Sequence, residues 1–277
     1  MSRIHPTAIV DPQAALDPTV EVGPYAIIEG QVTVGAETII GPHAWIRRGT
    51  TIGRANHIHY GAILGHWPQD LAFTDEDSYV RIGDENQIRE YVTIHRGTTP
   101  GSATVVGNHC FLMAMAHLGH NCHVGSHVII ANSSTLGGYV VVEDHAFISA
   151  QCVVHQFARI GRLALLSGMT GVGQDVCPFF MAAMRNQVVG INVVGLRRAG
   201  IAPAARAEIK QAFKLLYRSG LSIPHALEEL ERTTQSAEVQ HLIAFARASQ
   251  RGLCPYRGQK TQNLNDETAL EASGDSG

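Results

Sequence analysis

Residues 106–125 read VGNHCFLMAMAHLGHNCHVG, and this stretch decides the fold. In it an aliphatic residue returns at every sixth position, and a histidine returns three times at every third position. The aliphatic residues are Val106, Leu112, Leu118 and Val124, and the histidines are His117, His120 and His123. A fixed repeat places each side chain at a known phase of a rigid scaffold. The histidines are therefore candidates for a general base held on that scaffold.

The six-residue period extends far beyond this stretch. Stepping by six from Ile4 to Val172, every position carries Ile, Val or Leu except Asp70, Glu76 and Pro100. The pattern resumes in phase after each exception. We therefore expect two loops, near residues 65–81 and 95–105, to be extruded from one continuous structure.

A period of six fits neither an α-helix nor one long strand, but it fits short strands joined by tight corners. Glycine or asparagine is expected at the corners, because both tolerate left-handed backbone conformations. Three hexads, or about 18 residues, close one triangular coil, and coils stack at the strand spacing of about 4.8 Å. The sequence thus predicts a mainly β protein, with a parallel β-helix of about ten coils over residues 1–178.

The period changes after Pro178. Residues 179–259 are predicted to form a connecting segment and a helical region. Ile209, Phe213 and Leu216 recur at helical spacing within residues 202–219. Ser222 and Ser236 are expected to begin two further helices. Residues 260–277 are polar and small, and we expect them to be a disordered tail.

Composition excludes several classes of protein. The net charge of −3 argues against nucleic-acid binding, which normally needs a basic excess. No apolar run is long enough to span a membrane, and the N-terminus lacks an apolar signal segment, so a cytoplasmic location is expected. The five cysteines are expected to be reduced. Cys110, Cys122 and Cys152 share one phase of the repeat and are expected to be small core residues.

Stacking arithmetic gives the candidate chemistry. If one coil holds about 18 residues, then His120, Gly138 and Gln156 lie in one column. A neutral imidazole accepts a proton near neutral pH, and a glycine N–H stabilises a developing oxyanion. Most histidines on such a surface are solvated polar residues without a catalytic role. We expect this of His57, His59, His66 and His127. His155 equally suits a corner residue that hydrogen-bonds the backbone.

Five runs resemble the UDP-N-acetylglucosamine O-acyltransferase family, whose enzymes catalyse the first step of lipid A synthesis. They are YVTIHRGT (91–98), AHLGHNC (116–122), VHQF (154–157), QDVCP (174–178) and YRSG (217–220). The hexads also resemble those of left-handed β-helix acyltransferases. Left-handed coils are therefore expected here, against the general preference for right-handed crossovers.

The resemblance implies transfer of a 3-hydroxyacyl group from acyl carrier protein to the 3-hydroxyl of UDP-N-acetylglucosamine. It implies that His120 is the general base and that Gly138 contributes the oxyanion hole. The implied substrate contacts are Asp70, His117, His155, Gln156, Asn192 and Arg198, and the implied residue of the acyl-chain pocket is Gly168. The family forms homotrimers with sites between subunits. It needs no metal and no organic cofactor beyond the phosphopantetheine on the carrier.

Four residues depart from the family pattern. Asn121 replaces the usual Asp after the catalytic histidine, and Tyr139 replaces a His after the oxyanion glycine. Ala72 replaces a Lys, and Val194 replaces a Glu. The arithmetic places Tyr139 over Asn121, so two departures meet at one place. They leave two alternatives open: acyl transfer to a 3-amino UDP-sugar, and a catalytically weakened binding or regulatory paralogue.

Two further expectations concern other ligands. A zinc hydratase of the γ-carbonic anhydrase type carries a pair of His ligands spaced H-x4-H. None of the fifteen histidines has a partner at that spacing, which disfavours a zinc site. An acidic carrier protein needs a basic docking surface. The candidate cations are Arg159, Arg162, Arg185, Arg197 and Lys214, although scattered surface charge explains them equally well.

Overall fold

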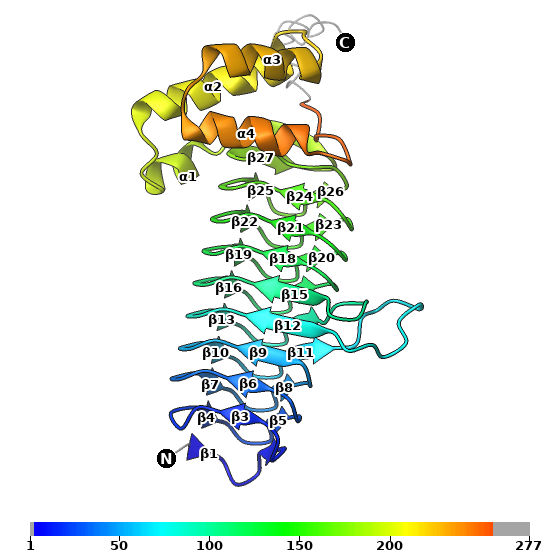
Figure 1. Cartoon of the computed structure of the whole chain (residues 1–277). Helices are drawn as coiled ribbons and strands as arrows, with labels where there is room; N and C mark the ends of the chain where they lie inside the picture. Colours follow the sequence, from blue (N-terminus) through cyan, green and yellow to red (C-terminus); the bar gives the residue numbers. More distant parts are fainter. Residues whose placement is uncertain (1–2, 257–277) are drawn as a thin grey trace, which may run out of the picture.

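The chain folds into a triangular prism of stacked coils with helices at one end (Figure 1). This computed structural model describes residues 3–256. Each coil contributes a short strand to each of three sheets, named here sheets A, B and C. The predicted left-handed parallel β-helix is confirmed.

The strands run in the following spatial order. Sheet A contains β1 (Arg3–Ile4), β4 (Glu21–Val22), β7 (Ile39–Ile40), β10 (His57–Ile58), β13 (Gln87–Ile88), β16 (Phe111–Leu112), β19 (Ile129–Ile130), β22 (Phe147–Ile148), β25 (Leu165–Leu166), β27 (Phe180–Ala183) and β28 (Gln187–Ile191). Sheet B contains β2 (Ile9–Val10), β5 (Ile27–Ile28), β8 (Trp45–Ile46), β11 (Ile63–His66), β14 (Thr93–His95), β17 (His117–Leu118), β20 (Thr135–Leu136), β23 (Val153–Val154) and β26 (Gly171–Val172). Sheet C contains β24 (Arg159–Ile160), β21 (Val141–Val142), β18 (His123–Val124), β15 (Ala103–Val106), β12 (Tyr79–Ile82), β9 (Thr50–Ile52), β6 (Thr33–Val34) and β3 (Ala15–Leu16).

The aliphatic residue of each hexad points into the prism. Leu112, Leu118 and Ile130 are fully buried there, as are most residues at the same phase. Burial of apolar surface stabilises the folded state by about 25 cal/mol for each Å² removed from water. The repeat therefore supplies one continuous core along the length of the prism.

The corners accept more residue types than expected. Asn121, Tyr139 and Phe157 all adopt a left-handed backbone, with φ of 59°, 59° and 65°. At Tyr139 and Phe157 this strain is offset by a repeated bond, in which the amide N–H donates to a carbonyl of the preceding coil. The Tyr139 N–H reaches the His120 carbonyl at 2.9 Å, for example. Corner positions can therefore carry side chains other than glycine and asparagine.

Two loops leave the prism, as predicted, at residues 67–78 and 96–102. Across them Thr51 pairs with Arg81, and Arg81 pairs with Val105, so the insertions preserve the phase of the hexads. The loops are joined through Arg96, a buried cation whose guanidinium is paired with Asp75. The second loop is therefore held beside the first.

The helical region comprises α1 (Val193–Arg198), α2 (Pro203–Arg218), α3 (Ile223–Thr233) and α4 (Ala237–Arg247). The last three match the predicted helices, and Ser236 caps α4 by accepting a bond from the Val239 N–H. The connecting segment has more structure than expected. β27 adds a parallel rung to sheet A, and β28 returns antiparallel to it. The predicted disorder of residues 260–277 concerns residues outside the described range.

The cysteines are buried and unpaired, as predicted. Burial raises the pKa of Cys110 to about 11 and that of Cys122 to about 12. The reactive thiolate is therefore scarce at neutral pH. We expect iodoacetamide at pH 8 to leave the native protein unlabelled and to modify all five thiols in denaturant, as measured by intact mass. Rapid labelling of the native protein would contradict this packing.

No helix within residues 3–256 is both long and apolar enough to cross a membrane.

Candidate active site

His120, Gly138 and Gln156 lie in a column at the corner where sheet B turns into sheet C. The sheet B strands that precede them pair in register, as His117 does with Thr135. A methyl group built on Gly138 would lie 2.4 Å from His120 Cε1 and 2.5 Å from its Nε2. The imidazole therefore covers the glycine, as the arithmetic predicts.

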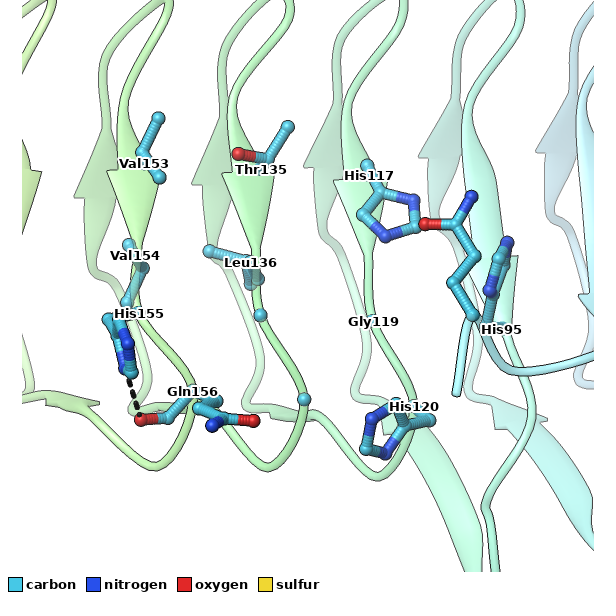
Figure 2. Close-up of a pocket in the computed structure, with 13 residues that line it drawn as sticks. His95, His117, Gly119, His120, Thr135, Leu136, Val153, Val154, His155 and Gln156 are labelled. Carbon is cyan, nitrogen blue, oxygen red and sulfur yellow. Dashed lines mark hydrogen bonds between the residues drawn. The ribbon is translucent and has the colours of Figure 1, made fainter. Parts of the chain in front are cut away.

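A groove of about 520 Å³ opens beside this column (Figure 2). It brings together His117, His120, Gly138, His155, Gln156 and His95. In Figure 2, His117 and His120 lie on one coil, while His155 and Gln156 lie two coils away. His155 Nδ1 is 3.1 Å from its neighbour's carbonyl, that of Gln156. The groove is thus lined by imidazoles and by the backbone of glycine-rich corners.

His120 is held by its neighbour in sequence. Its Nδ1 lies 3.0 Å from the Oδ1 of Asn121. The Tyr139 ring packs edge-on against the imidazole, with ring centroids 5.2 Å apart. The two departures from the family pattern, Asn121 and Tyr139, therefore both contact the candidate base.

A second imidazole pair forms the far wall of the groove. His117 Nδ1 is 2.7 Å from the Thr93 hydroxyl, and its ring meets that of His95 at 4.9 Å. Burial lowers the pKa of His117. Burial, reinforced by nearby His117, His66 and His120, lowers the pKa of His95 to about 4. Both rings are therefore neutral at pH 7.

Sequence reasoning did not select His95, because the second loop shifts the register. Thr93 pairs with His117 across that loop, an offset of four hexads where uninterrupted coils have three. This offset puts His95 level with Gly119, one residue before the candidate base. Counting hexads across the loop would have found it.

His95 makes stability depend on pH. Its pKa is about 4 in the folded chain against 6.5 for the free side chain, so the unfolded chain binds more protons between these values. The contribution of His95 to the free energy of unfolding is therefore fully present above pH 6.5. It falls as the pH drops through this window, and the loss is about 2 kcal/mol at pH 5. We expect urea unfolding of His95→Gln to show a drop in the free energy of unfolding between pH 7 and pH 5 that is smaller by about this amount. The exposed His127→Gln is the control, and equal slopes in both variants would contradict the assignment.

Four predicted residues lie outside the groove. Asp70 stands on the first loop, where its carboxylate accepts a 3.0 Å bond from the Ala72 N–H, although neighbouring Gln69 lines the groove. Gly168 occupies a different corner, between sheets A and B. Space for a side chain exists there, since a methyl group would approach only the Ala150 carbonyl, at 3.6 Å.

Arg198 is the last residue of α1, and Asn192 is the N-cap residue just before this helix. The Asn192 side chain caps this helix, accepting a 2.9 Å bond from the Gly195 N–H and donating one of 2.9 Å to the Leu163 carbonyl. Arg198 is exposed at the end of the helix. Figure 1 shows α1 and the extruded loops on opposite sides of the prism. Within one chain α1 therefore lies on the other side of the prism from the loop that bonds, through Thr98, to the neighbour of His120.

The described part of the chain contains no preformed metal-binding site. Among residues 3–256, no three His, Cys, Asp or Glu side chains are arranged to hold an ion. The three stacked imidazoles of His109, His127 and His145 lie parallel, with centroids 4.8 and 4.7 Å apart. That geometry stacks the rings and does not converge their nitrogens on one point.

Comparison with known proteins identifies the family. Residues 175–254 match the family model described as UDP-N-acetylglucosamine O-acyltransferase, domain 2, and residues 103–138 match the bacterial transferase hexapeptide model. The acyl-[acyl-carrier-protein]–UDP-N-acetylglucosamine O-acyltransferase of Paraburkholderia xenovorans is 48% identical over 260 residues, which cover 91% of this chain and 99% of that protein. The corresponding protein of Halorhodospira halophila is 47% identical over 256 residues, 91% of this chain and 99% of that one.

Solved structures agree. LpxA from Acinetobacter baumannii superposes with a TM-score of 0.88 at 36% identity, covering 92% of this chain and all of that one. The UDP-N-acetylglucosamine acyltransferase of Francisella novicida gives 0.88 at 33% identity, covering 98% of this chain and 100% of that one. The chain belongs to the UDP-N-acetylglucosamine O-acyltransferase family of hexapeptide-repeat enzymes.

Proposed function

We propose that this enzyme transfers a 3-hydroxyacyl group from acyl carrier protein to the 3-hydroxyl of UDP-N-acetylglucosamine, with His120 as general base. The observation that carries the proposal is the contact between the His120 imidazole and Gly138. It sets a proton acceptor beside a backbone N–H that makes no hydrogen bond within residues 3–256. Several other hexads have proline at this corner position, including Pro18, Pro24 and Pro42, so the coil does not need that donor.

The chemistry follows from these two groups. His120 Nε2 takes the proton of the sugar hydroxyl, and the oxygen attacks the thioester carbonyl. The Gly138 N–H stabilises the oxyanion as it forms. The intermediate then collapses with cleavage of the C–S bond, and the protonated imidazole gives its proton to the departing thiolate of phosphopantetheine. His117, His155 and Gln156 contact the substrates along the groove, and no metal or further cofactor takes part.

A second copy of the chain completes the site. Apolar side chains are exposed on the outer face of sheet B and along the corner between sheets A and B. They are Ile9, Ile27, Val153, Tyr25, Tyr60, Tyr91, Met115 and Met169. Exposed apolar side chains gathered along one side of the prism favour association. In a homotrimer formed through this surface, a neighbour supplies Asn192, Arg198 and Gly168, and Arg198 offsets the charge of the nucleotide diphosphate.

The acyl carrier protein docks on a groove of the helical region. Five cations line it, with Phe213 and Leu196 among its apolar residues; they are Arg197, Arg206, Lys210, Lys214 and Arg218. Only Arg197 and Lys214 belong to the predicted cluster. Arg159 is already paired with Asp175 at 2.9 Å and packed over Phe245. An acidic carrier is attracted to such a concentration of positive charge.

Charge reversal tests this docking surface. We expect Lys210→Glu to raise the KM for the acyl carrier protein about tenfold at low salt, because repulsion replaces attraction. The KM for the UDP-sugar should not change. Arg54→Glu, at an exposed cation of the prism, is the matched control. Equal effects of the two variants would move the carrier to another surface.

The reaction itself is tested with purified 3-hydroxyacyl carrier proteins of several chain lengths. UDP-N-acetylglucosamine and its 3-amino analogue serve as acceptors, and mass spectrometry identifies the product. We expect an ester with the hydroxyl acceptor. Turnover only with the amine would overturn the acceptor assignment, and binding without turnover would identify a weakened paralogue. Cytoplasmic location remains a prediction.

A further inference from the structure

The amide oxygen of Asn121 stands at the centre of a hydrogen-bond cluster. It lies 3.1 Å from the Thr98 backbone nitrogen, 3.0 Å from the Thr98 hydroxyl and 3.0 Å from His120 Nδ1. The Asn121 side chain is buried, with 6% of the residue exposed. Thr98 comes from the second extruded loop, so this loop reaches the candidate site.

These contacts fix the orientation of the amide. A backbone N–H can only donate, so the Asn121 atom facing Thr98 must be the oxygen. An amide oxygen only accepts, so the His120 Nδ1 beside it must carry a hydrogen. In the neutral imidazole the other nitrogen, Nε2, then holds the lone pair. The network therefore selects the tautomer that general-base catalysis at Nε2 requires.

Tyr139 extends the network by one more bond. Its hydroxyl lies 3.0 Å from the Thr98 hydroxyl. The Thr98 hydroxyl has a single proton, and it must donate that proton to Asn121 to avoid opposing two acceptor oxygens. The Tyr139 hydroxyl is therefore the donor to Thr98. The Tyr139 ring is itself held by stacking on Phe157, with centroids 4.9 Å apart.

We propose that Thr98 and Tyr139 are positioning residues that hold His120 in its reactive tautomer through the amide of Asn121. The proposal rests on the proposed role of His120 as general base. A neutral amide has no charge with which to orient an imidazole, and it can turn over to present its NH₂ group. The two bonds from Thr98 prevent that rotation. The bond from Tyr139 keeps the Thr98 hydroxyl pointing at the amide.

Removing the Thr98 hydroxyl tests the network. We expect Thr98→Val to lower kcat about tenfold, the loss of one buried hydrogen bond, with the KM for the UDP-sugar little changed. Thr98→Ser restores the hydroxyl and should recover kcat to within about twofold. Tyr139→Phe should cost less than Thr98→Val, because Thr98 still donates. The matched control is Thr99→Val, since the adjacent Thr99 is exposed on the same loop.

A double-mutant cycle separates positioning from structural damage. If Thr98 acts through Asn121, then Thr98→Val costs nothing further in an Asn121→Ala background. An equal loss in both backgrounds, or full activity of Thr98→Val, overturns the proposal. The His120→Ala variant distinguishes this failure from that of the proposed function, because an active His120→Ala enzyme has a different base. If Thr98→Val does not fold, Tyr139→Phe in the parent and Asn121→Ala backgrounds decides by the same cycle.

Discussion

Replacing His120 by alanine is expected to lower kcat by about 10²–10⁴-fold, the usual contribution of a positioned general base. The KM for the UDP-sugar should change little, because the imidazole acts on the proton in the transition state. The fold should survive, since His120 lies on a corner and contributes nothing to the prism core. Steady-state kinetics on variants with unchanged circular dichroism measure the effect.

The matched control for this loss is His127→Ala. His127 belongs to the same repeat but lies at the corner between sheets C and A, away from the groove. We expect its kcat to stay within about twofold of the parent enzyme. If the two variants lose activity equally, the imidazoles contribute to assembly and the base lies elsewhere. If His120→Ala keeps full activity, the acceptor is activated by another group in the groove.

The prism and the central column could be predicted because they depend on one regular quantity. Each aliphatic residue of a hexad must point inward, so the phase of every corner follows from its number alone. One consequence of that regularity is His120 over Gly138. Another is the proximity of Tyr139 to Asn121, since both bond to the Thr98 hydroxyl. The helices were also predictable, since Ser236 and the spacing of Ile209 and Phe213 act locally.

The rest of the site depends on departures from regularity. The position of His95 in the groove could not be predicted from the regular repeat, because an inserted loop changes the offset between coils. Thr98 escaped because it is a loop residue, and nothing in its neighbours marks the loop's path back to Asn121. Arg198 was named only by resemblance, and the side of the prism on which it lies follows from the position of α1. The repeat therefore predicts which residues stack between coils, whereas contacts made by the inserted loops are known only from the three-dimensional structure.

Replacing Gly138 by alanine is expected to lower kcat by about a hundredfold while keeping the backbone N–H that stabilises the oxyanion. The added methyl group would lie 2.4 Å from His120 Cε1, a distance at which one of the two groups must move. The imidazole is the freer group, so it swings away from the position that its bond to Asn121 defines. Misplacement of a catalytic group by about 1 Å commonly costs this much.

The matched control is Gly173→Ala, two coils further along the same edge. A methyl group there meets only ordinary contacts, at 3.8 Å from the Asn186 side chain, so its kcat should be unchanged. Gly138→Ala should add no further loss in a His120→Ala background, because its effect passes through the imidazole. A further loss there would mean that the methyl group obstructs the oxyanion itself. Full activity of Gly138→Ala would contradict the placement of His120 over Gly138, since an enzyme that tolerates this methyl group cannot hold its base where the coil geometry puts it.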